Sequence, residues 1–421
     1  MTKSLKTIIL AAGKGVRMKS DLPKVLHPVC GRPMIRYVTD LAKSVGSLKT
    51  FVVLGHQHDV IKTQLDKSVT VAIQKKLIGT ADAIKSVRHH FQNDHGNVLV
   101  LCGDAPLLTR ETIRVLLAKH KSSKAVCTFL TATVHCPCGY GRVVRNSEGQ
   151  VIAIREELDA TDEEKTIKEI NSGVYCFQSR ELFQAISTVG INSKKREFYL
   201  TDLISLFKDR GLSVETATTR DGHEALGINT RADLALAQTI LRKRILKNLM
   251  LNGVTIEDPE TTYVDADVTI GRDTVIRSHT VIENDVRIGN RCMIGPFSHI
   301  RPGCIIDDDV QLGNFSEVSR STVGQGTWMR HFSFLGDSRV GKNVNIGAGV
   351  VTANFDGKNK NRTIISDQAF IGSDSILVAP VVIGKKSITG AGCVVTKNSK
   401  VPNGAVAVGV PAKIKLRRKT K

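Results

Sequence analysis

The chain has 421 residues, a formal net charge of +20, 41% hydrophobic residues and 5% aromatic residues. This length predicts two or more domains with ordinary hydrophobic cores, and the shortage of aromatic rings disfavours a stacking platform for single-stranded nucleic acid. Part of the positive charge lies in residues 241–247 and 413–421. It favours attraction of polyanionic small substrates over nucleic-acid binding, because the sequence contains no nucleic-acid-binding module.

Nine cysteines are scattered along the chain, several of them within apolar stretches, for example Cys102, Cys127 and Cys176. Such positions are typical of reduced structural thiols in a cytosolic protein. Residues 135–138 (HCPC) offer too few zinc ligands, because no second Cys/His pair has matching spacing. The N-terminal apolar run is too short for a signal peptide and no stretch approaches the length of a membrane span, so we predict a cytoplasmic protein that does not bind membranes.

The first predicted element is a buried strand at residues 7–10 (TIIL), which ends at the small residues 11–13 (AAG). Gly13 and Gly15 allow close approach of a ligand, and inward-turned N–H groups in such a loop bind anions. The loop is neither a Walker A motif nor a dinucleotide fingerprint. It predicts a nucleoside triphosphate site, although an ordinary glycine-rich turn also fits the spacing. Three cations accompany it: Lys14, Arg17 and Lys24.

Strand and helix patterns alternate from residue 1 to about 228, which predicts a mostly parallel sheet with helices on both faces. Ligands bind such sheets beyond the carboxyl ends of the strands. Asp104 follows an apolar strand there and can hold Mg²⁺ against a triphosphate; the alternative is that it caps the helix starting near Thr109. The predicted strands are Thr7–Leu10, Thr50–Leu54, Val98–Cys102, Ala125–Val134, Gly173–Phe177 and Ser213–Thr218, and the helices include Arg110–His120 and Tyr199–Asp209.

Residues 230–251 predict one long helix, because they are rich in Ala, Leu and Arg and contain neither Pro nor Gly. After it, aliphatic residues recur every six positions, at Ile270, Ile276, Ile282, Ile288, Ile294, Ile300, Ile306, Leu312 and Val318. The period resumes at Ile371, Leu377, Ile383 and Val395, after an irregular insertion around residues 354–362. This hexapeptide repeat predicts a left-handed parallel β-helix. The predicted domain limits are 1–228, a helical linker at 229–251, and a β-helix with a basic tail at 252–421.

Residues 10–26 (LAAGKGVRMKSDLPKVL) resemble the signature of sugar-1-phosphate nucleotidyltransferases. Nearly the whole chain is similar to the bacterial bifunctional N-acetylglucosamine-1-phosphate uridyltransferase / glucosamine-1-phosphate N-acetyltransferase family. This resemblance implies a Rossmann-like domain that transfers the uridylyl group of UTP to N-acetylglucosamine-1-phosphate and releases pyrophosphate. It also implies a β-helix domain that moves an acetyl group from acetyl-CoA to glucosamine-1-phosphate, a homotrimer, Mg²⁺ as cofactor, and the supply of cell-wall and lipopolysaccharide precursors.

The resemblance implies roles for individual residues in the uridylyl reaction. Gln74, Gly79 and Thr80 match contacts to uracil, and Gly141, Glu156 and Asn171 match contacts to the sugar phosphate. Taken alone, each of these residues fits a turn or a polar core position equally well. The inference rests on finding all of them together and in the expected order along the chain. The implied catalytic cations are Arg17 and Lys24, the implied Mg²⁺ ligands are Asp104 and Asn229, and the remaining implied nucleotide contacts are Leu10, Ala11, Ala12, Gly13 and Gly103.

In the β-helix, His331 matches the general base of the family, and Arg301 matches a phosphate contact. The implied sugar and acetyl-CoA contacts are Asn345, Ala348, Asn354, Phe355, Ser373 and Ala391. The chain also departs from the family pattern. Ser319 stands where a phosphate-binding lysine is expected, Phe334 and Phe355 replace tyrosines, the C-terminal arginine that meets the coenzyme is absent, and the β-helix is about two coils shorter than the enterobacterial form. Arg320 and Arg330 are possible substitutes for the missing lysine. Because successive side chains of a strand point to opposite faces, however, each arginine is predicted to point away from the face that its neighbour occupies.

Two other functions fit the sequence. The chain could be a uridyltransferase whose β-helix is inactive or uses another acyl acceptor, which a comparison of amino-sugar phosphates would reveal. It could also be a non-catalytic, nucleotide-sensing subunit. The presence of Lys24, Asp104 and Asn229 argues against the second alternative.

Overall fold

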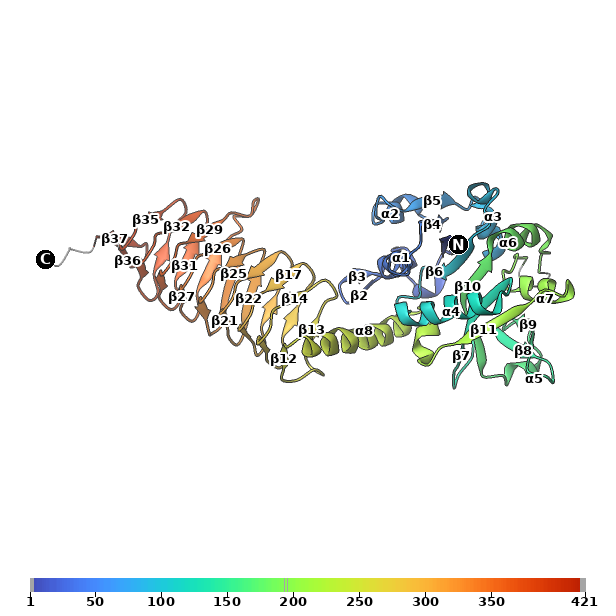
Figure 1. Ribbon diagram of the computed structural model, residues 1–421. Coiled ribbons are helices and arrows are strands. Elements are labelled where there is room, and N and C mark those ends of the chain that lie inside the picture. The colour runs from blue at the N-terminus through green and yellow to red at the C-terminus, as the bar shows by residue number, and fades with distance from the viewer. Residues whose placement is uncertain (1–3, 193, 195, 417–421) are drawn as a thin grey trace. The chain divides into compact units, whose positions relative to one another are not determined.

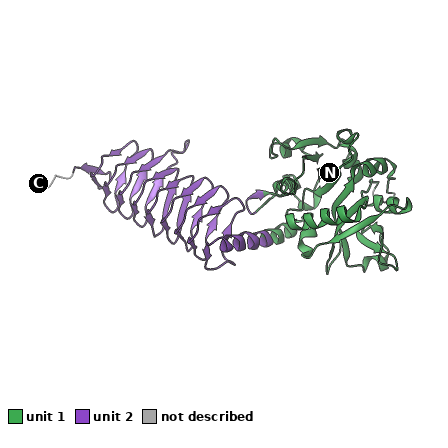
Figure 2. Ribbon diagram, viewed as in Figure 1, with its two compact units in different colours: residues 1–29, 33–238 green, residues 30–32, 239–421 purple. Residues whose placement is uncertain are grey.

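The structure is a computed structural model that describes residues 4–192, 194 and 196–416. It divides into two compact units, residues 1–29 with 33–238 and residues 30–32 with 239–421 (Figure 2). The division along the chain falls within helix α8, Arg231–Leu251. The domain limits 1–228, 229–251 and 252–421 stay a prediction.

The first unit is built on a nine-stranded mixed sheet with the main strand order β11-β7-β10-β6-β1-β4-β5 (Figure 1). Strands β6, β1, β4 and β5 are parallel, so their carboxyl ends lie at one edge, whereas β10 runs antiparallel to both β6 and β7. The predicted mostly parallel α/β sheet is therefore confirmed. The strands are β1 Leu5–Ala11, β4 Lys49–Leu54, β5 Thr70–Ile73, β6 Asn97–Cys102, β7 Cys127–Thr133, β8 Arg142–Arg145, β9 Val151–Arg155, β10 Glu169–Gln178 and β11 Val214–Thr218, with a separate pair β2 Pro28–Val29 and β3 Arg32–Pro33.

Alternate residues of the central strands enter two different cores. Ile8 and Val100 pack with helices α3, α6 and α7 on one face, and Ile9 and Leu101 pack with α1 and α4 on the other. Helices thus cover both faces of the sheet, as the alternating pattern predicts. The helices are α1 Met34–Ser44, α2 His58–Lys62, α3 Thr80–Lys85, α4 Arg110–Ser123, α5 Asp162–Lys165, α6 Ser179–Ala185 and α7 Asp202–Asp209.

The second unit is a parallel β-helix whose coils stack so that equivalent strands lie one above the next in three sheets (Figure 1). Sheet I contains β12 Thr255–Ile256, β15 Val275–Ile276, β18 Met293–Ile294, β21 Gln311–Leu312, β24 Trp328–Met329, β27 Asn345–Ile346, β30 Phe370–Ile371, β33 Ile388–Thr389, β36 Val406–Val408 and β37 Lys413–Lys415. Sheet II contains β13 Tyr263–Val264, β16 Val281–Ile282, β19 His299–Ile300, β22 Ser316–Ser319, β25 Ser333–Gly336, β28 Val351–Ala353, β31 Ile376–Val378 and β34 Val394–Val395. Sheet III contains β14 Thr269–Ile270, β17 Val286–Ile288, β20 Cys304–Ile306, β23 Thr322–Val323, β26 Ser338–Val340, β29 Thr363–Ile365, β32 Val381–Ile383 and β35 Lys400–Val401.

The aliphatic residue of each hexapeptide points into the prism, where Ile294 and Ile300 are fully buried. Equivalent residues of the first coils are 18 positions apart, as in the Cys292–Thr274 hydrogen bond. The middle coils shorten to 17, as between Val344 and Thr327, and the last coils return to 18, as between Ile376 and Val394. This shortening, rather than the end of the β-helix, is why the six-residue period breaks after Val318. The buried column continues through Val323, Met329, Leu335, Val340 and Ile346.

The two ends of the β-helix core are covered by the chain itself. Leu246 and Leu249 of α8 pack into the core at the first coils. At the other end, β37 pairs antiparallel with β36. The last residues of the basic tail, 417–421, lie outside the described residues. Among the helices that the structure describes, none has the length and apolarity needed to cross a membrane.

Candidate active sites

The loop after β1 brings cations next to exposed backbone. Gly15 has φ +63°, and a Cβ at this position would lie 2.6 Å from Lys24 Cβ, so only glycine lets Lys24 cross the loop. A Cβ on the exposed Gly13 would meet nothing within 4 Å. Leu10, Ala11 and Ala12 lead into this turn from the carboxyl end of β1, and the exposed Arg17 follows it.

The Lys24 side chain contacts residues from two other segments of the chain, Asp104 and Asn229. Its Nζ forms an ion pair with the Asp104 carboxylate and donates a hydrogen bond to Asn229 Oδ1 at 2.7 Å. Arg17 donates to the same Asn229 oxygen at 2.8 Å. The backbone holds the two acceptors together, because Ile228 N donates to Asp104 O at 2.9 Å. One oxygen from each of Asp104 and Asn229 therefore points at the same cationic atom.

This arrangement fits a magnesium ion. Carboxylate and amide oxygens are the donors that Mg²⁺ takes, and sites that bind it with a phosphate substrate commonly use one or two protein ligands. In the described part of the chain, no group of three or more His, Cys, Asp or Glu side chains forms a complete metal site. The helix-cap alternative for Asp104 is not what the structure shows, because Thr109 caps α4 by accepting a hydrogen bond from Thr112 N at 3.2 Å.

The residues that match uracil contacts lie beyond β4 and β5, where hydrogen bonds tie them to neighbouring backbone. Gln74 is 5% exposed, and its Nε2 donates to Gly79 O at 3.0 Å and to Asp82 Oδ2 at 2.9 Å. Gly79 has φ +111°, and a Cβ there would lie 2.4 Å from Phe198 O. Thr80 Oγ1 accepts a hydrogen bond from Leu200 N at 2.9 Å. Glycine is thus required at position 79, where two backbone segments meet.

The residues that match sugar-phosphate contacts also lie together. A Cβ on Gly141 would lie 3.7 Å from both Asn171 Cβ and Glu156 Oε1. Thr201 donates to Glu156 Oε1 at 3.0 Å, and Asn171 donates to the Tyr175 hydroxyl at 2.6 Å. Burial raises the pKa of Tyr175 well above its usual value, so its hydroxyl stays neutral and able to accept this bond.

Two residues that the sequence did not single out connect these groups. Thr201 follows Leu200 and so links Thr80 to Glu156. Tyr140 precedes Gly141, and the backbone of Gly227 hydrogen-bonds its hydroxyl. Burial raises the pKa of Tyr140, and the nearby charges of Asp233 and Asp104 raise it further. The implied uridylyl-site residues are therefore joined at the carboxyl edge of the sheet.

In the β-helix, one cavity of about 690 Å³ collects several implied acetyl-site residues: His331, Asn345, Ala348, Ser373 and Ala391. Its floor is bare backbone, since a Cβ on Gly347 would lie 2.6 Å from Ser373 N and one on Gly372 would lie 2.6 Å from Thr389 O. Trp328 and Phe370, which the sequence analysis did not predict, also line the cavity. Successive coils thus offer an open groove that ends near the exposed His331.

The other implied residues lie elsewhere on the same unit. Arg301 follows β19 and donates to Glu317 at 3.1 Å, while Asn354 is buried and hydrogen-bonds the Asp337 carboxylate. Phe355 is 61% exposed on the loop between β28 and β29. Within one chain, therefore, the implied acetyl-site residues form two groups at two different corners of the prism.

Known proteins match both units. The MobA-like NTP transferase domain family matches residues 7–199, the bacterial transferase hexapeptide family matches residues 285–320, and the hexapeptide repeat of succinyl-transferase matches residues 362–397. The bifunctional protein GlmU of Geobacillus thermodenitrificans is 45% identical, over 96% of this chain and 94% of its own length. GlmU of Clostridioides difficile is 40% identical over 96% and 95%. The chain belongs to the bifunctional GlmU family.

Membership in the GlmU family confirms the predicted enzyme class. The chain is a transferase with a nucleotidyltransferase half and a hexapeptide-repeat acyltransferase half, and its uridyltransferase and acetyltransferase activities serve UDP-N-acetylglucosamine and cell-wall synthesis. The residues that carry these activities stay predictions.

One expectation about the departures from the GlmU pattern is wrong. Arg320 sits at a corner with φ +48°, where strand alternation does not apply, and its Nη1 donates to Ser319 Oγ at 2.8 Å. Its Nε and Nη2 donate to the Asp337 carboxylate at 2.7 and 2.9 Å, and this pairing holds the pKa of Asp337 below its usual value. Arg330 instead covers the Trp328 ring at 4.4 Å. The Arg320 guanidinium therefore lies beside Ser319, the residue that stands where the resemblance implies a lysine.

Proposed function

We propose that the first unit catalyses attack of N-acetylglucosamine-1-phosphate on UTP to give UDP-N-acetylglucosamine and pyrophosphate. The observation that carries this proposal is the convergence of Asp104 and Asn229 oxygens on Lys24 beside the glycine loop. That grouping combines an anion-binding turn, two hard oxygen ligands and two cations, which is what transfer between phosphates requires.

In the reaction, a phosphate oxygen of the sugar attacks the α-phosphorus of UTP. The new P–O bond forms as the bond from the α-phosphorus to the oxygen bridging to the β-phosphorus breaks, and the electron pair leaves with pyrophosphate. Lys24 and Arg17 offset the charge that develops on the phosphates, and the protein contributes positioning and electrostatics without a covalent intermediate. Mg²⁺ held by Asp104 and Asn229 would neutralise phosphate charge.

We assign the group of Gln74, Gly79 and Thr80 to the uracil and the group of Gly141, Glu156 and Asn171 to the sugar phosphate. The support is that hydrogen bonds fix side chains of each group before any ligand binds, so little ordering is left for binding to complete. Gly103 lets the ends of β1 and β6 come together, because a Cβ there would lie 3.1 Å from Ala11 Cβ.

A pyrophosphate-release assay tests this function. With UTP, N-acetylglucosamine-1-phosphate and Mg²⁺, we expect turnover that depends on all three and falls steeply in Asp104→Ala and Asn229→Ala. Equal turnover with other nucleoside triphosphates or other sugar phosphates would overturn the substrate assignment. Absence of pyrophosphate release would favour a nucleotide-sensing role.

We propose that the second unit acetylates glucosamine-1-phosphate. His331 takes a proton from the amine as its nitrogen attacks the thioester carbonyl of acetyl-CoA, and the carbon–sulfur bond then breaks to release the CoA thiolate. The backbone groove along Ala348, Ser373 and Ala391 supports an extended coenzyme, and N–H groups near Ala348 would stabilise the oxyanion. Lack of CoA release from millimolar substrates would overturn this activity.

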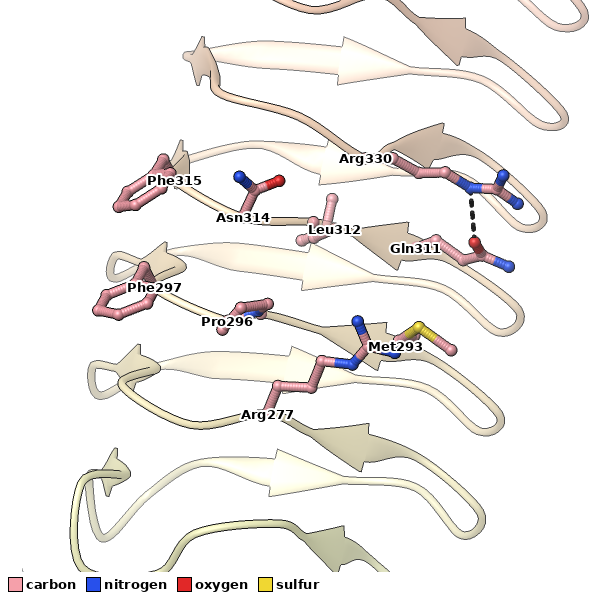
Figure 3. A pocket seen from close by; sticks show the side chains of 11 residues that line it. Arg277, Met293, Pro296, Phe297, Gln311, Leu312, Asn314, Phe315 and Arg330 are labelled. Atoms are coloured by element: carbon pink, nitrogen blue, oxygen red, sulfur yellow. Dashed lines mark hydrogen bonds between the residues drawn. The ribbon is translucent and has the colours of Figure 1, made fainter.

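A trimer through the β-helix would complete the acetyl site. The rings of His279, Phe297 and Phe315 stack at one corner, with centroids 4.6 and 5.1 Å apart, and Phe297 and Phe315 are 46% and 60% exposed. Figure 3 shows Phe297 and Phe315 of this column at a cavity of about 510 Å³ that Gln311 and Arg330 also line. Such an exposed aromatic column favours contact with another copy.

Trimers that contain two different variants test directly whether two copies of the chain share one acetyl site. His331 and Asn354 lie in the two separate groups of implied residues, so we expect His331→Ala and Asn354→Ala homotrimers to be inactive. Co-expression of the two variants should restore part of the acetyl transfer, because some sites then receive both native residues. No restoration, or a monomer by light scattering, would overturn the shared site.

We also assign the sugar-phosphate contact of the missing lysine to Arg320. Its guanidinium is oriented by Asp337 and reaches Ser319, next to the coil that carries Arg301. Loss of one charge-assisted phosphate contact costs about 1.5–3 kcal/mol, so Arg320→Ala should raise the KM for glucosamine-1-phosphate about ten- to a hundredfold. The exposed Arg287→Ala, which does not line the cavity that Arg320 and Asp337 share, is the matched control, and an unchanged KM in Arg320→Ala would contradict the assignment.

We place the enzyme in the cytoplasm. All nine cysteines are free thiols in the structure, which suits a reducing compartment.

A further inference from the structure

Cys136 and Cys138 form a pair of exposed thiols on the loop between β7 and β8. Their sulfur atoms lie 3.4 Å apart, within hydrogen-bonding distance. The other seven cysteines are buried or partly buried. Nothing in the proposed uridylyl or acetyl reactions uses these two thiols, so their exposure and proximity need a separate explanation.

The loop holds the pair in a compact turn. Tyr140 N donates to Pro137 O at 3.2 Å, and Gly139 between them has φ +82°, as a turn of this kind requires. Gly139 N donates to Glu157 Oε2 at 2.9 Å, and Lys168 Nζ donates to His135 O at 3.0 Å. A disulfide needs a sulfur–sulfur distance of about 2.05 Å, so a local movement of the turn suffices to form one.

The same turn leads directly into the uridylyl site. Tyr140, its last residue, has its hydroxyl hydrogen-bonded by the backbone of Gly227. Gly141 follows and faces Glu156 and Asn171. Only Gly139 separates Cys138 from Tyr140, so we expect a change in the turn to move groups that we assign to the sugar phosphate.

Electrostatics favour reaction at one of the two sulfurs. The hydrogen bond that the two sulfur atoms share lowers the pKa of Cys136, and the positive charges of Lys168 and Arg142 lower it further. The thiolate is the nucleophile in thiol oxidation, and exposure gives an oxidant access to it. Cys138 lies in place to act as the resolving thiol.

We propose that Cys136 and Cys138 are a reversible dithiol–disulfide site that lowers uridylyl transfer when oxidised; the effect on activity rests on the proposed function of the first unit. With hydrogen peroxide as the oxidant, the Cys136 thiolate attacks one peroxide oxygen, the O–O bond breaks, and protonation of the leaving hydroxide gives water and a sulfenic acid. Cys138 then attacks the sulfenyl sulfur, the S–S bond forms, the S–O bond breaks and a second water leaves. Two thiols and one peroxide thus give one disulfide and two waters, and a small-molecule dithiol reverses the change by exchange.

The site can be tested on the full chain by treatment with equimolar peroxide followed by alkylation and peptide mass spectrometry. We expect the peptide that contains residues 136–138 to lose two hydrogens and to regain them with dithiothreitol. An unmodified peptide, a sulfinic acid, a disulfide between two chains, or stable zinc binding that blocks oxidation would each overturn the proposal.

The effect on catalysis is tested by both activities of the oxidised enzyme. A shift of positioning groups by about 1 Å costs up to about a hundredfold in rate, so we expect kcat/KM for uridylyl transfer to fall about tenfold or more. Acetyl transfer, measured in the same sample, should not change. Cys136→Ser and Cys138→Ser should keep the reduced enzyme's activity and lose the response to peroxide.

These measurements distinguish a failure of the dithiol–disulfide proposal from a failure of the uridylyl function that we propose for the first unit. If the reduced enzyme lacks uridylyl transfer, the function of the first unit is wrong, while the disulfide is still detected by mass. If the disulfide forms and uridylyl transfer is unaffected, or if the Cys136→Ser variant is equally sensitive to peroxide, the regulatory role is wrong.

Discussion

Lys24→Ala should abolish most uridylyl transfer while leaving acetyl transfer intact. The Lys24 side chain is 14% exposed and makes charged contacts to both Asp104 and Asn229. If Asp104 and Asn229 held a divalent cation, the Lys24 ammonium would be free to contact phosphate. Two charge-assisted hydrogen bonds of about 1.5–3 kcal/mol each correspond to about 3–6 kcal/mol, or about a hundred- to ten-thousandfold in rate.

Pyrophosphate release under saturating UTP measures this loss. The exposed Lys62→Ala is the matched control, because it removes the same charge from the same unit away from the loop. Acetyl transfer by the same preparation reports that the variant is folded. Uridylyl transfer within about threefold of wild type would refute the role of Lys24, since that ratio corresponds to less than one ordinary hydrogen bond.

Three further outcomes follow from the structure. His331→Ala should lower acetyl transfer by about a hundredfold or more without affecting pyrophosphate release, because general base catalysis contributes about that much; an equal loss in both assays would indicate misfolding instead. Ile300→Ala, at a fully buried position, should destabilise the β-helix by about 2–5 kcal/mol in urea unfolding, and a loss below about 1 kcal/mol would contradict its place in the core. Because the folded pKa of Asp337 lies below its usual 3.8, its contribution to stability is present above that pH and is lost as the pH falls through the folded value. The difference in unfolding free energy between wild type and Asp337→Asn should therefore shrink below about pH 3.8, and a constant difference would refute the pairing with Arg320.

The β-helix could be predicted from spacing because each six-residue unit repeats one burial requirement. The period breaks after Val318 because a five-residue step to Val323 keeps the aliphatic column while losing the six-residue spacing. In the first unit, α7 begins at Asp202 rather than Tyr199, because Leu200 N is hydrogen-bonded to Thr80 before the helix starts. Tertiary contacts of this kind leave no local signal in the sequence.

Site residues could be predicted from the sequence where one short motif determines both the backbone conformation and the charged side chains, as in the loop from Gly13 to Lys24. Tyr140 and Thr201 were missed because their roles depend on segments distant in sequence meeting at the sheet edge. The position of Arg320 was mispredicted because a corner residue with positive φ does not follow strand alternation. The separation of His331 from Asn354 on two corners likewise needs three-dimensional information, since the repeat alone does not say which corners adjoin in an assembly.

The most direct measurement is a crystal structure of the enzyme with UTP and Mg²⁺. The account predicts a triphosphate over the backbone from Gly13 to Arg17, a metal ion contacted by Asp104 and Asn229, and the Lys24 ammonium on phosphate oxygens. A nucleotide bound elsewhere, or a metal ion away from Asp104 while Lys24 keeps its ion pair, would contradict it.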